Sequence, residues 1–304
     1  MKAKNYMMIF LCGMMVVAGT ACKNENAPED KTVQKRYLTI KMSDAAGAPI
    51  KKATITDEGS TLLAEWKAGD EVSYCNLSRV KTPSDDLIIG TMTAASSGVK
   101  SDLNGDVECT ANDYLAIVYP AVDMSTSTYS YGDGVHGKFT ISLVGQDGSL
   151  SKLATHYHCV YGRAHVLSVT GTTAEAEMEK MQSLLTICKF SFTDGTNPIP
   201  VNTLTISYGG SDSKTGKYPQ SATVTVTNLT ENSAAAAEGV LPSSVTPLTI
   251  NAGGATEVYV ALLPETGSCE YKFTVTSGSN TYTGTAEAHL KKGEFVPALG
   301  LKLQ

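Results

Sequence analysis

The sequence has few of the residues and motifs on which catalytic and metal sites are usually built. It contains one Trp, five His and no Cys-x-x-Cys pair, and it lacks the spacings Gly-x-Ser-x-Gly, His-Glu-x-x-His and Gly-x-x-x-x-Gly-Lys-Ser/Thr. These absences leave a nucleophile-elbow hydrolase, a zinc protease and a P-loop nucleotidase without support. A structural zinc site normally needs paired cysteines. We therefore expect neither an enzyme nor a metal or other cofactor.

Basic residues are also in short supply. The 304-residue chain has 24 Lys and Arg against 30 Asp and Glu, a net charge of −6. A protein that binds DNA or RNA neutralises phosphates with a basic face, so we expect no nucleic-acid partner. Hydrophobic residues make up 42% of the chain, which is enough for a substantial core. About 280 residues remain after the N-terminal segment, enough for one large domain or two of ordinary size.

Long apolar runs are rare, and the one at the N-terminus has the length of an export signal. Lys2 and Lys4 precede an apolar stretch at residues 7–17, and small residues lead to Cys22. This pattern is typical of a secretory signal peptide and is too short for a spanning helix. Small residues before a cysteine resemble a bacterial lipobox, which implies a signal at 1–21 and a lipid on Cys22. An ordinary signal with an incidental cysteine is the alternative.

The segment 22–36 is polar and contains proline, which is typical of a flexible tether. Beyond it, five cysteines are widely and irregularly spaced: Cys75, Cys109, Cys159, Cys188 and Cys269. We expect most of them to be small buried hydrophobic residues, although an exported chain also permits one or two disulfides.

From residue 37 onward, apolar and polar residues alternate in short segments, which predicts β-strands. Residues 113–120 form a nearly continuous apolar run, which predicts a central strand that ends at Pro120. Residues 172–180 are the one stretch that favours a helix, and we place a passage between two domains there. Many short strands with almost no helix predict an all-β fold of two antiparallel sandwiches, at 37–172 and 173–304.

Several short motifs occur in order along the chain. They are the lipobox, Trp66-Lys67-Ala68-Gly69-Asp70-Glu71-Val72, Leu103-Asn104-Gly105, residues 114–120, Gln146, Tyr157-His158-Cys159-Val160-Tyr161-Gly162, residues 184–192, Leu263-Pro264 and residues 290–295. In these residues the chain resembles the fimbrillins, pilus subunits of Bacteroides-type bacteria. The resemblance implies two tandem transthyretin-like β-sandwich domains. It also implies that an Arg-specific protease removes the first strand of a lipoprotein precursor, and that a terminal strand of the next subunit fills the groove.

Two stretches fit this scheme. Arg36 lies between the polar tether and the first predicted strand, so it is the candidate cleavage site, with an ordinary solvated arginine as the alternative. Leu299, Leu301 and Leu303 alternate near the C-terminus, and we expect them on one face of a strand. That strand is either the donor for another subunit or the closing strand of the second sandwich.

Other candidate sites are weaker. His156 and His158 would share a face of a strand and hold a metal, although incidental histidines explain them better. Asp102, Asn104, Asp106 and Glu108 superficially suggest calcium, but a turn between strands explains them better. A glycan-binding module would need an exposed aromatic platform, for which Trp66 is the one tryptophan. A β-sandwich glycosidase would need two carboxylates at a cleft, and no acidic pair stands out.

We therefore expect a structural subunit of a cell-surface fimbria that mediates adhesion. The alternative is a monomeric surface lipoprotein that binds glycan or a host protein. The expected partners are other fimbrial subunits, an Arg-specific maturation protease, the outer membrane through the lipid, and a host or bacterial surface ligand. The expected location is the cell outer membrane and the fimbrium on the cell surface.

Overall fold

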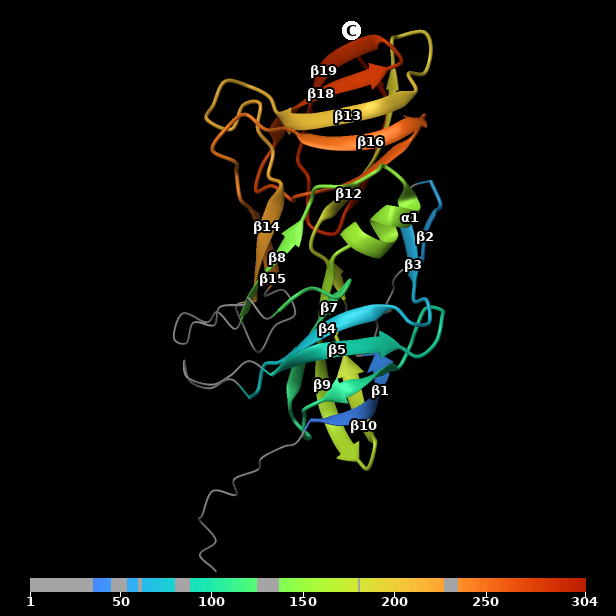
Figure 1. Cartoon of the computed structure of the whole chain (residues 1–304), viewed down its shortest axis with the longest axis vertical. Helices are drawn as coiled ribbons and strands as arrows, with labels where there is room; N and C mark the ends of the chain where they lie inside the picture. Colours follow the sequence, from blue (N-terminus) through green and yellow to red (C-terminus); the bar gives the residue numbers. More distant parts are fainter. Residues whose placement is uncertain are drawn as a thin grey trace, which may run out of the picture. The chain divides into compact units, whose positions relative to one another are not determined.

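The computed structural model describes residues 35–44, 54–59, 62–79, 88–124, 137–179, 181–226 and 235–304. These residues lie mostly in β-strands, so the all-β prediction is confirmed (Figure 1). Among these residues, helical structure is confined to α1 (Leu150–Lys152) and the π-helix η1 (Leu153–Tyr157). In this part of the chain, no helix has the length and hydrophobicity needed to cross a membrane.

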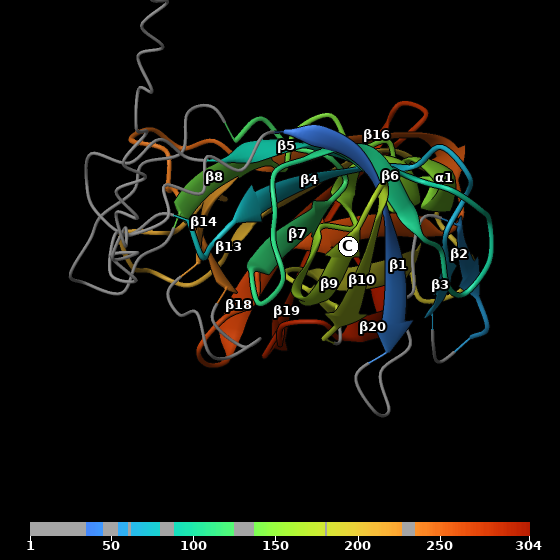
Figure 2. The same ribbon diagram turned by 90° about the horizontal axis from the view of Figure 1, so that it is seen from below.

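Seven strands of the N-terminal half pair in the order β10-β1-β6-β5-β4-β7-β9, and β9 pairs back with β10 (Figure 2). Hydrogen bonds therefore run round a closed ring, not along two separate facing sheets. The ring strands are β1 (Arg36–Asp44), β4 (Glu71–Asn76), β5 (Ile89–Ala94), β6 (Leu103–Val107), β7 (Tyr114–Tyr119), β9 (Val160–Thr170) and β10 (Thr173–Met178). A short strand, β11 (Gln182–Ser183), also pairs with β9.

The ring encloses a hydrophobic core, because alternate side chains of its strands point inward. Leu38 and Ile40 of β1 point inward and are fully buried, as are Val72 and Tyr74 of β4. In β10, Ala174, Ala176 and Met178 are buried while Glu175 and Glu177 alternate with them on the outer side. Residues 173–178, within the stretch 172–180 that favours a helix locally, therefore form a strand. Ala, Glu and Met favour helices locally, but their alternation buries one complete face of a strand.

The C-terminal half contains three sheets, with strand orders β17-β12-β20, β16-β13-β18-β19 and β15-β14-β8. Their strands are β8 (Gly137–Ser142), β12 (Thr186–Thr193), β13 (Val201–Tyr208), β14 (Ser221–Val226), β15 (Ala235–Gly239), β16 (Leu248–Ala255), β17 (Val258–Leu262), β18 (Cys269–Ser277), β19 (Asn280–Ala288) and β20 (Phe295–Lys302). A separate hairpin is formed by β2 (Thr54–Asp57) and β3 (Leu62–Glu65).

Two strand pairs are parallel, which corrects the expectation of purely antiparallel sheets. β1 runs parallel to β10, and β20 runs parallel to β12. Parallel neighbours need a long connection, whereas antiparallel neighbours can be joined by a tight turn. β1 and β20 are the first and last described strands, so no short turn constrains the direction of these pairs.

The predicted boundary at residue 172 falls in the turn between β9 and β10, which are neighbours in one sheet. β12, which starts at Thr186, is the first strand after the predicted boundary that belongs to the C-terminal sheets. One of these sheets also contains β8, which precedes the boundary. Strands from the two sides of residue 172 are therefore shared between the sheets. The division into two transthyretin-like domains stays a prediction.

Candidate functional site

β1 occupies a distinctive place in the ring. It lies between β6, to which it is antiparallel, and β10, to which it is parallel; the other five neighbouring pairs of the ring are antiparallel. The Thr39 N–H donates to the Thr172 carbonyl at 3.0 Å, while Leu38 and Ile40 are buried among the ring residues. β1 therefore completes both the hydrogen bonding and the core of the ring.

Arg36 is the first residue of β1, pairs with Val107 and is exposed. A cut after Arg36 leaves Leu38 and Ile40 in the ring. The first described strand therefore starts at the predicted cut, and cleavage there would leave this strand in place. Cleavage at Arg36 itself stays a prediction. The predicted lipid site, Cys22, lies outside the described residues.

Leu299, Leu301 and Leu303 do not share one face of β20, contrary to expectation. The register with β12 shifts between Phe190 and Phe192, and Gly300 adopts a φ of 67°. Leu299 is consequently 54% exposed, while Leu303 is 2% exposed. Gln304 and Thr283 of β19 exchange two backbone hydrogen bonds, at 2.8 and 2.9 Å. In the described chain, this segment occupies the place of a closing strand.

The motif around Trp66 forms a turn that buries the indole. Gly69 has a φ of 88°, and Asp70 Oδ2 accepts the Lys67 N–H at 2.7 Å. The Trp66 ring is 2% exposed and meets Tyr119 edge-on at 6.1 Å. Trp66 is therefore a core residue and offers no exposed platform for a glycan.

The Leu103-Asn104-Gly105 motif lies in β6, where the strand passes close to β5. A Cβ atom on Gly105 would lie 2.6 Å from the Thr91 carbonyl oxygen. Both this motif and the one around Trp66 thus have structural roles in the ring.

A partly buried ion pair joins the β2–β3 hairpin to the C-terminal sheets. Lys189 Nζ lies 2.8 Å from Asp57 Oδ2 and 3.0 Å from Glu257 Oε1, and the Tyr259 hydroxyl donates to Asp57 at 2.6 Å. Hydrogen bonds from Lys189 and then Tyr259 lower the pKa of Asp57 to about 2. The pKa of Lys189 is raised, mainly by the Asp57 hydrogen bond. Both groups are charged at neutral pH, so this cluster is a clamp and not an acid–base pair.

The remaining candidate residues show no arrangement for chemistry. His156 lies in η1 and His158 follows it, so the two do not share a strand face as we expected. In the described ranges, no group of three His, Cys, Asp or Glu residues is placed to hold a metal ion. Residues 132–137 have the Gly-x-Gly-x-x-Gly spacing of a dinucleotide site, but they lead into strand β8 instead of opening a helix.

The five described cysteines form no disulfide, and all except Cys269 are buried. Burial raises the pKa of Cys75 and of Cys188 to about 12, and that of Cys109 to about 11. Such thiols are unreactive at neutral pH, so these cysteines act as small hydrophobic residues.

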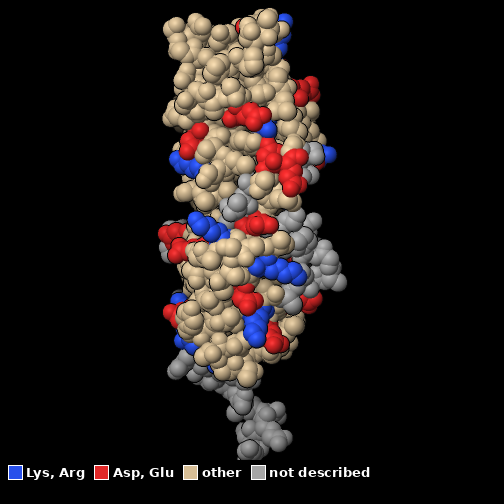
Figure 3. All heavy atoms as spheres, turned by 90° about the vertical axis from the view of Figure 1, so that its right-hand side faces the viewer, with Lys and Arg blue, Asp and Glu red and all other residues tan. Residues whose placement is uncertain are grey.

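Charges of both signs are mixed on the face shown in Figure 3. Few charged side chains lie at its upper end, the level at which Figure 1 places β13, β16, β18 and β19. This face offers no continuous basic area of the kind that a nucleic-acid backbone needs.

No protein-family model matches the chain, and no curated protein matches it. Among solved structures it is similar to a fimbrial protein from Bacteroides ovatus ATCC 8483, with 10% identity and a TM-score of 0.42, over 88% of this chain and 49% of that one. It is similar to a putative cell adhesion protein from Bacteroides eggerthii DSM 20697, with 13% identity and a TM-score of 0.36, over 88% and 87% of the two chains.

The shaft pilin SpaA from Lactobacillus rhamnosus GG is similar at 10% identity and a TM-score of 0.32, over 88% of this chain and 97% of that one. The present chain spans about half the length of the B. ovatus protein. These structural neighbours are fimbrial, adhesion and pilin proteins, but likenesses this distant carry no argument about function.

Proposed function

We propose that the chain is a structural subunit of a cell-surface fimbria, exported as a lipoprotein precursor and assembled by strand exchange, and that the fimbria mediates adhesion. The observation that carries this proposal is the position of β1. It is the first described strand, and it is inserted between β6 and β10 through the one parallel pairing of the ring. Removal of β1 would break its own pairings with β6 and β10 and no other strand pair.

Loss of β1 would open a groove of defined chemistry. The facing edges of β6 and β10 would lose their partner, and the places of Leu38 and Ile40 in the core would be empty. A strand of another subunit with apolar residues at alternate positions would restore both the hydrogen bonds and the packing. Because such a contact joins two different surfaces, its repetition gives an open filament.

For β1 to be released, the protease must cut the chain after this strand. A cut that frees this strand has to lie in the connection to β2, between Asp44 and Thr54. This connection contains Lys51 and Lys52 but no Arg. The protease that frees β1 would therefore be one that cleaves after Lys, whereas a cut after Arg36 would only release the tether and the lipid on Cys22.

A disulfide that locks β1 into the ring tests the proposal. Thr39 directs its N–H toward β10, so Thr39 and Asn104 form a non-hydrogen-bonded antiparallel pair, the closest kind. Cysteines at both positions can form a disulfide across β1 and β6. We expect cells producing Thr39→Cys/Asn104→Cys to show no filaments by electron microscopy, and reduction with dithiothreitol to restore them.

The matched control is Thr205→Cys/Thr249→Cys. This pair has the same antiparallel geometry between β13 and β16, away from β1, and filaments should form with the disulfide intact. Normal filaments from the oxidised Thr39/Asn104 variant would overturn exchange at β1.

A further inference from the structure

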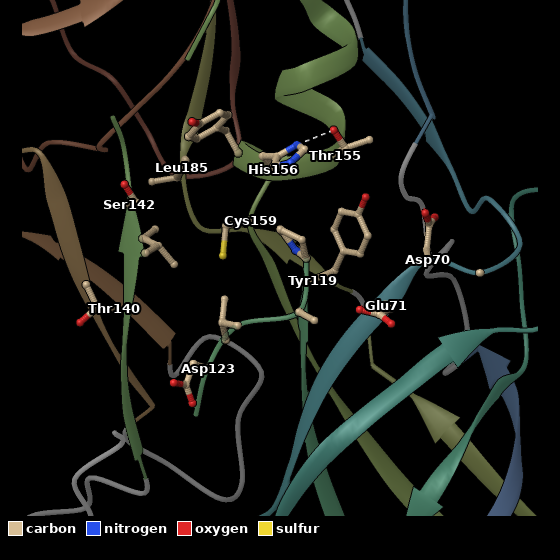
Figure 4. Close-up of a pocket in the computed structure, with 16 residues that line it drawn as sticks. Asp70, Glu71, Tyr119, Asp123, Thr140, Ser142, Thr155, His156, Cys159 and Leu185 are labelled. Atoms are coloured by element: carbon tan, nitrogen blue, oxygen red, sulfur yellow. Dashed lines mark hydrogen bonds between the residues drawn. The ribbon is translucent and has the colours of Figure 1, made fainter. Parts of the chain in front are cut away.

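A cavity of about 630 Å³ lies between the end of β7 and the strand β8 (Figure 4). Thr140 and Ser142 of β8 lie on one side of it, and Asp70 and Glu71 on the other. Residues 120–123, which follow β7, and residues 155–157 of η1 also line the cavity. We call it the β8 groove.

In the described part of the chain, no strand pairs with the edge of β8 that faces this groove. Among the described strands, β8 pairs with β14 alone. The Leu143 N–H donates to the Gln220 carbonyl at 2.9 Å, so Ile141 and Phe139 also direct their backbone groups toward β14. The N–H and C=O groups of Thr140 and Ser142 therefore point into the groove, where an extended peptide can pair with them.

The charge of the groove selects the kind of peptide. Asp70, Glu71 and Asp123 line it, and the described lining residues include no Lys or Arg. Glu71 is exposed, so its carboxylate can meet an incoming side chain. An extended segment that carries Lys or Arg is the occupant that complements both the open edge and the carboxylates.

The chain itself contains one such segment. Residues 31–36 have the sequence Lys-Thr-Val-Gln-Lys-Arg, with three basic residues and no acidic one, and no other six-residue window holds three basic residues. Arg36 pairs with Val107, whereas Glu71 and Tyr119 mark the opposite end of the ring. β1 runs from the Arg36 end toward the groove end, so Arg36 lies at the end of the ring opposite to its own groove.

We propose that the β8 groove binds residues 31–36 of a second copy of the chain as an extended strand added to β8. Docking joins two precursors, because processing after β1 removes residues 31–36. This docking does not depend on the proposed function. Only its place in fimbrial assembly rests on that function.

Fluorescence anisotropy with a labelled, capped Lys-Thr-Val-Gln-Lys-Arg peptide tests this contact on the exported chain. We expect binding that weakens at high salt, and at least tenfold weaker binding to Ser142→Pro, which removes an edge N–H. Glu71→Gln/Asp123→Asn should lose as much affinity, and it keeps the test decisive if Ser142→Pro does not fold. Ser142→Ala and Asp106→Asn are the matched controls and should bind as the parent does.

Sedimentation velocity tests the source of the segment. A second-copy contact predicts self-association that Lys31→Glu/Lys35→Glu abolishes. Equal peptide binding by all variants, or no binding, would overturn the groove as the site. Peptide binding without self-association would mean that another occupant uses the groove, and would overturn the second-copy assignment. Filaments that form without peptide binding would overturn this inference alone, whereas peptide binding without filaments would overturn the proposed function alone.

Discussion

At the residue scale, the ion pair between Asp57 and Lys189 shows how a single contact can hold two parts of the chain together. Asp57 lies in the outlying β2–β3 hairpin, while Lys189 and Tyr259 lie in β12 and β17. The Asp57 and Lys189 side chains are 12% and 11% exposed, so solvent screens the pair only partly. Removal of one partner would leave a poorly solvated charge.

We predict that Lys189→Met lowers the free energy of unfolding by about 1–3 kcal/mol at pH 7. The pKa of Asp57 is lowered from 3.8 to about 2, so its contribution is complete above pH 3.8 and is lost as the pH falls through about 2. The gap between wild type and variant should therefore narrow between pH 3.8 and about pH 2, which urea unfolding at each pH would measure.

Lys272→Met, on an exposed position of β18, is the control and should change stability by no more than about 0.5 kcal/mol. A gap between wild type and Lys189→Met that stays constant down to pH 2 would show that the ionised Asp57 does not stabilise the fold.

For single residues, the sequence predicted whether a side chain is buried better than it predicted the strand face on which that side chain lies. Four of the five cysteines beyond Cys22 are buried, as their hydrophobic surroundings suggested. Leu299 was misplaced, because the bulge at Gly300 depends on the register with β12, which lies more than a hundred residues earlier. The burial of Trp66 depends likewise on a distant contact, because the turn folds its indole onto Tyr119. Local sequence patterns contain neither contact.

At the element scale, β20 lies at the end of its sheet, in the strand order β17-β12-β20. Several of its residues discourage another strand from pairing with it. Its neighbour on one side is β12, and its last contact, through Gln304, reaches β19. Pro297, the bulge at Gly300 and the exposed Lys302 lie along the strand, and each is a feature that protects sheet edges from unwanted pairing. In the described chain, β20 therefore has the pairing and the edge features of a closing strand.

We predict that Leu303→Ala lowers the free energy of unfolding by about 2–4 kcal/mol, because Leu303 is buried against the C-terminal core. Leu299→Ala, in the same strand but exposed, should change it by no more than about 0.5 kcal/mol. Chemical denaturation of both variants provides the measurement. Equal, small effects would mean that the end of β20 contributes little to its own fold and would revive the donor-strand alternative.

At the scale of the whole molecule, β7 lies between two cores. Leu115, Ile117 and Tyr119 point into the ring, whereas Ala116 and Val118 join a core that continues through the C-terminal sheets. The continuous apolar run at residues 113–120 predicted a central strand, and burial on both faces explains that pattern. The sharing of strands could not be predicted, because β8 finds its partner β14 about 80 residues later in the sequence.

Because β7 contributes side chains to both cores, we predict that the two cores unfold together. Trp66, the one tryptophan, reports on the ring core, while Val275 is fully buried in the other core. Val275→Ala should lower stability by about 2 kcal/mol. Its unfolding midpoint in urea should fall equally by Trp66 fluorescence and by far-UV circular dichroism. A Trp66 transition that keeps the wild-type midpoint would instead mean that the ring unfolds independently of the C-terminal sheets. Exchange of β1 would then disturb the ring alone, whereas coupled unfolding means that each exchanged strand stabilises the whole subunit.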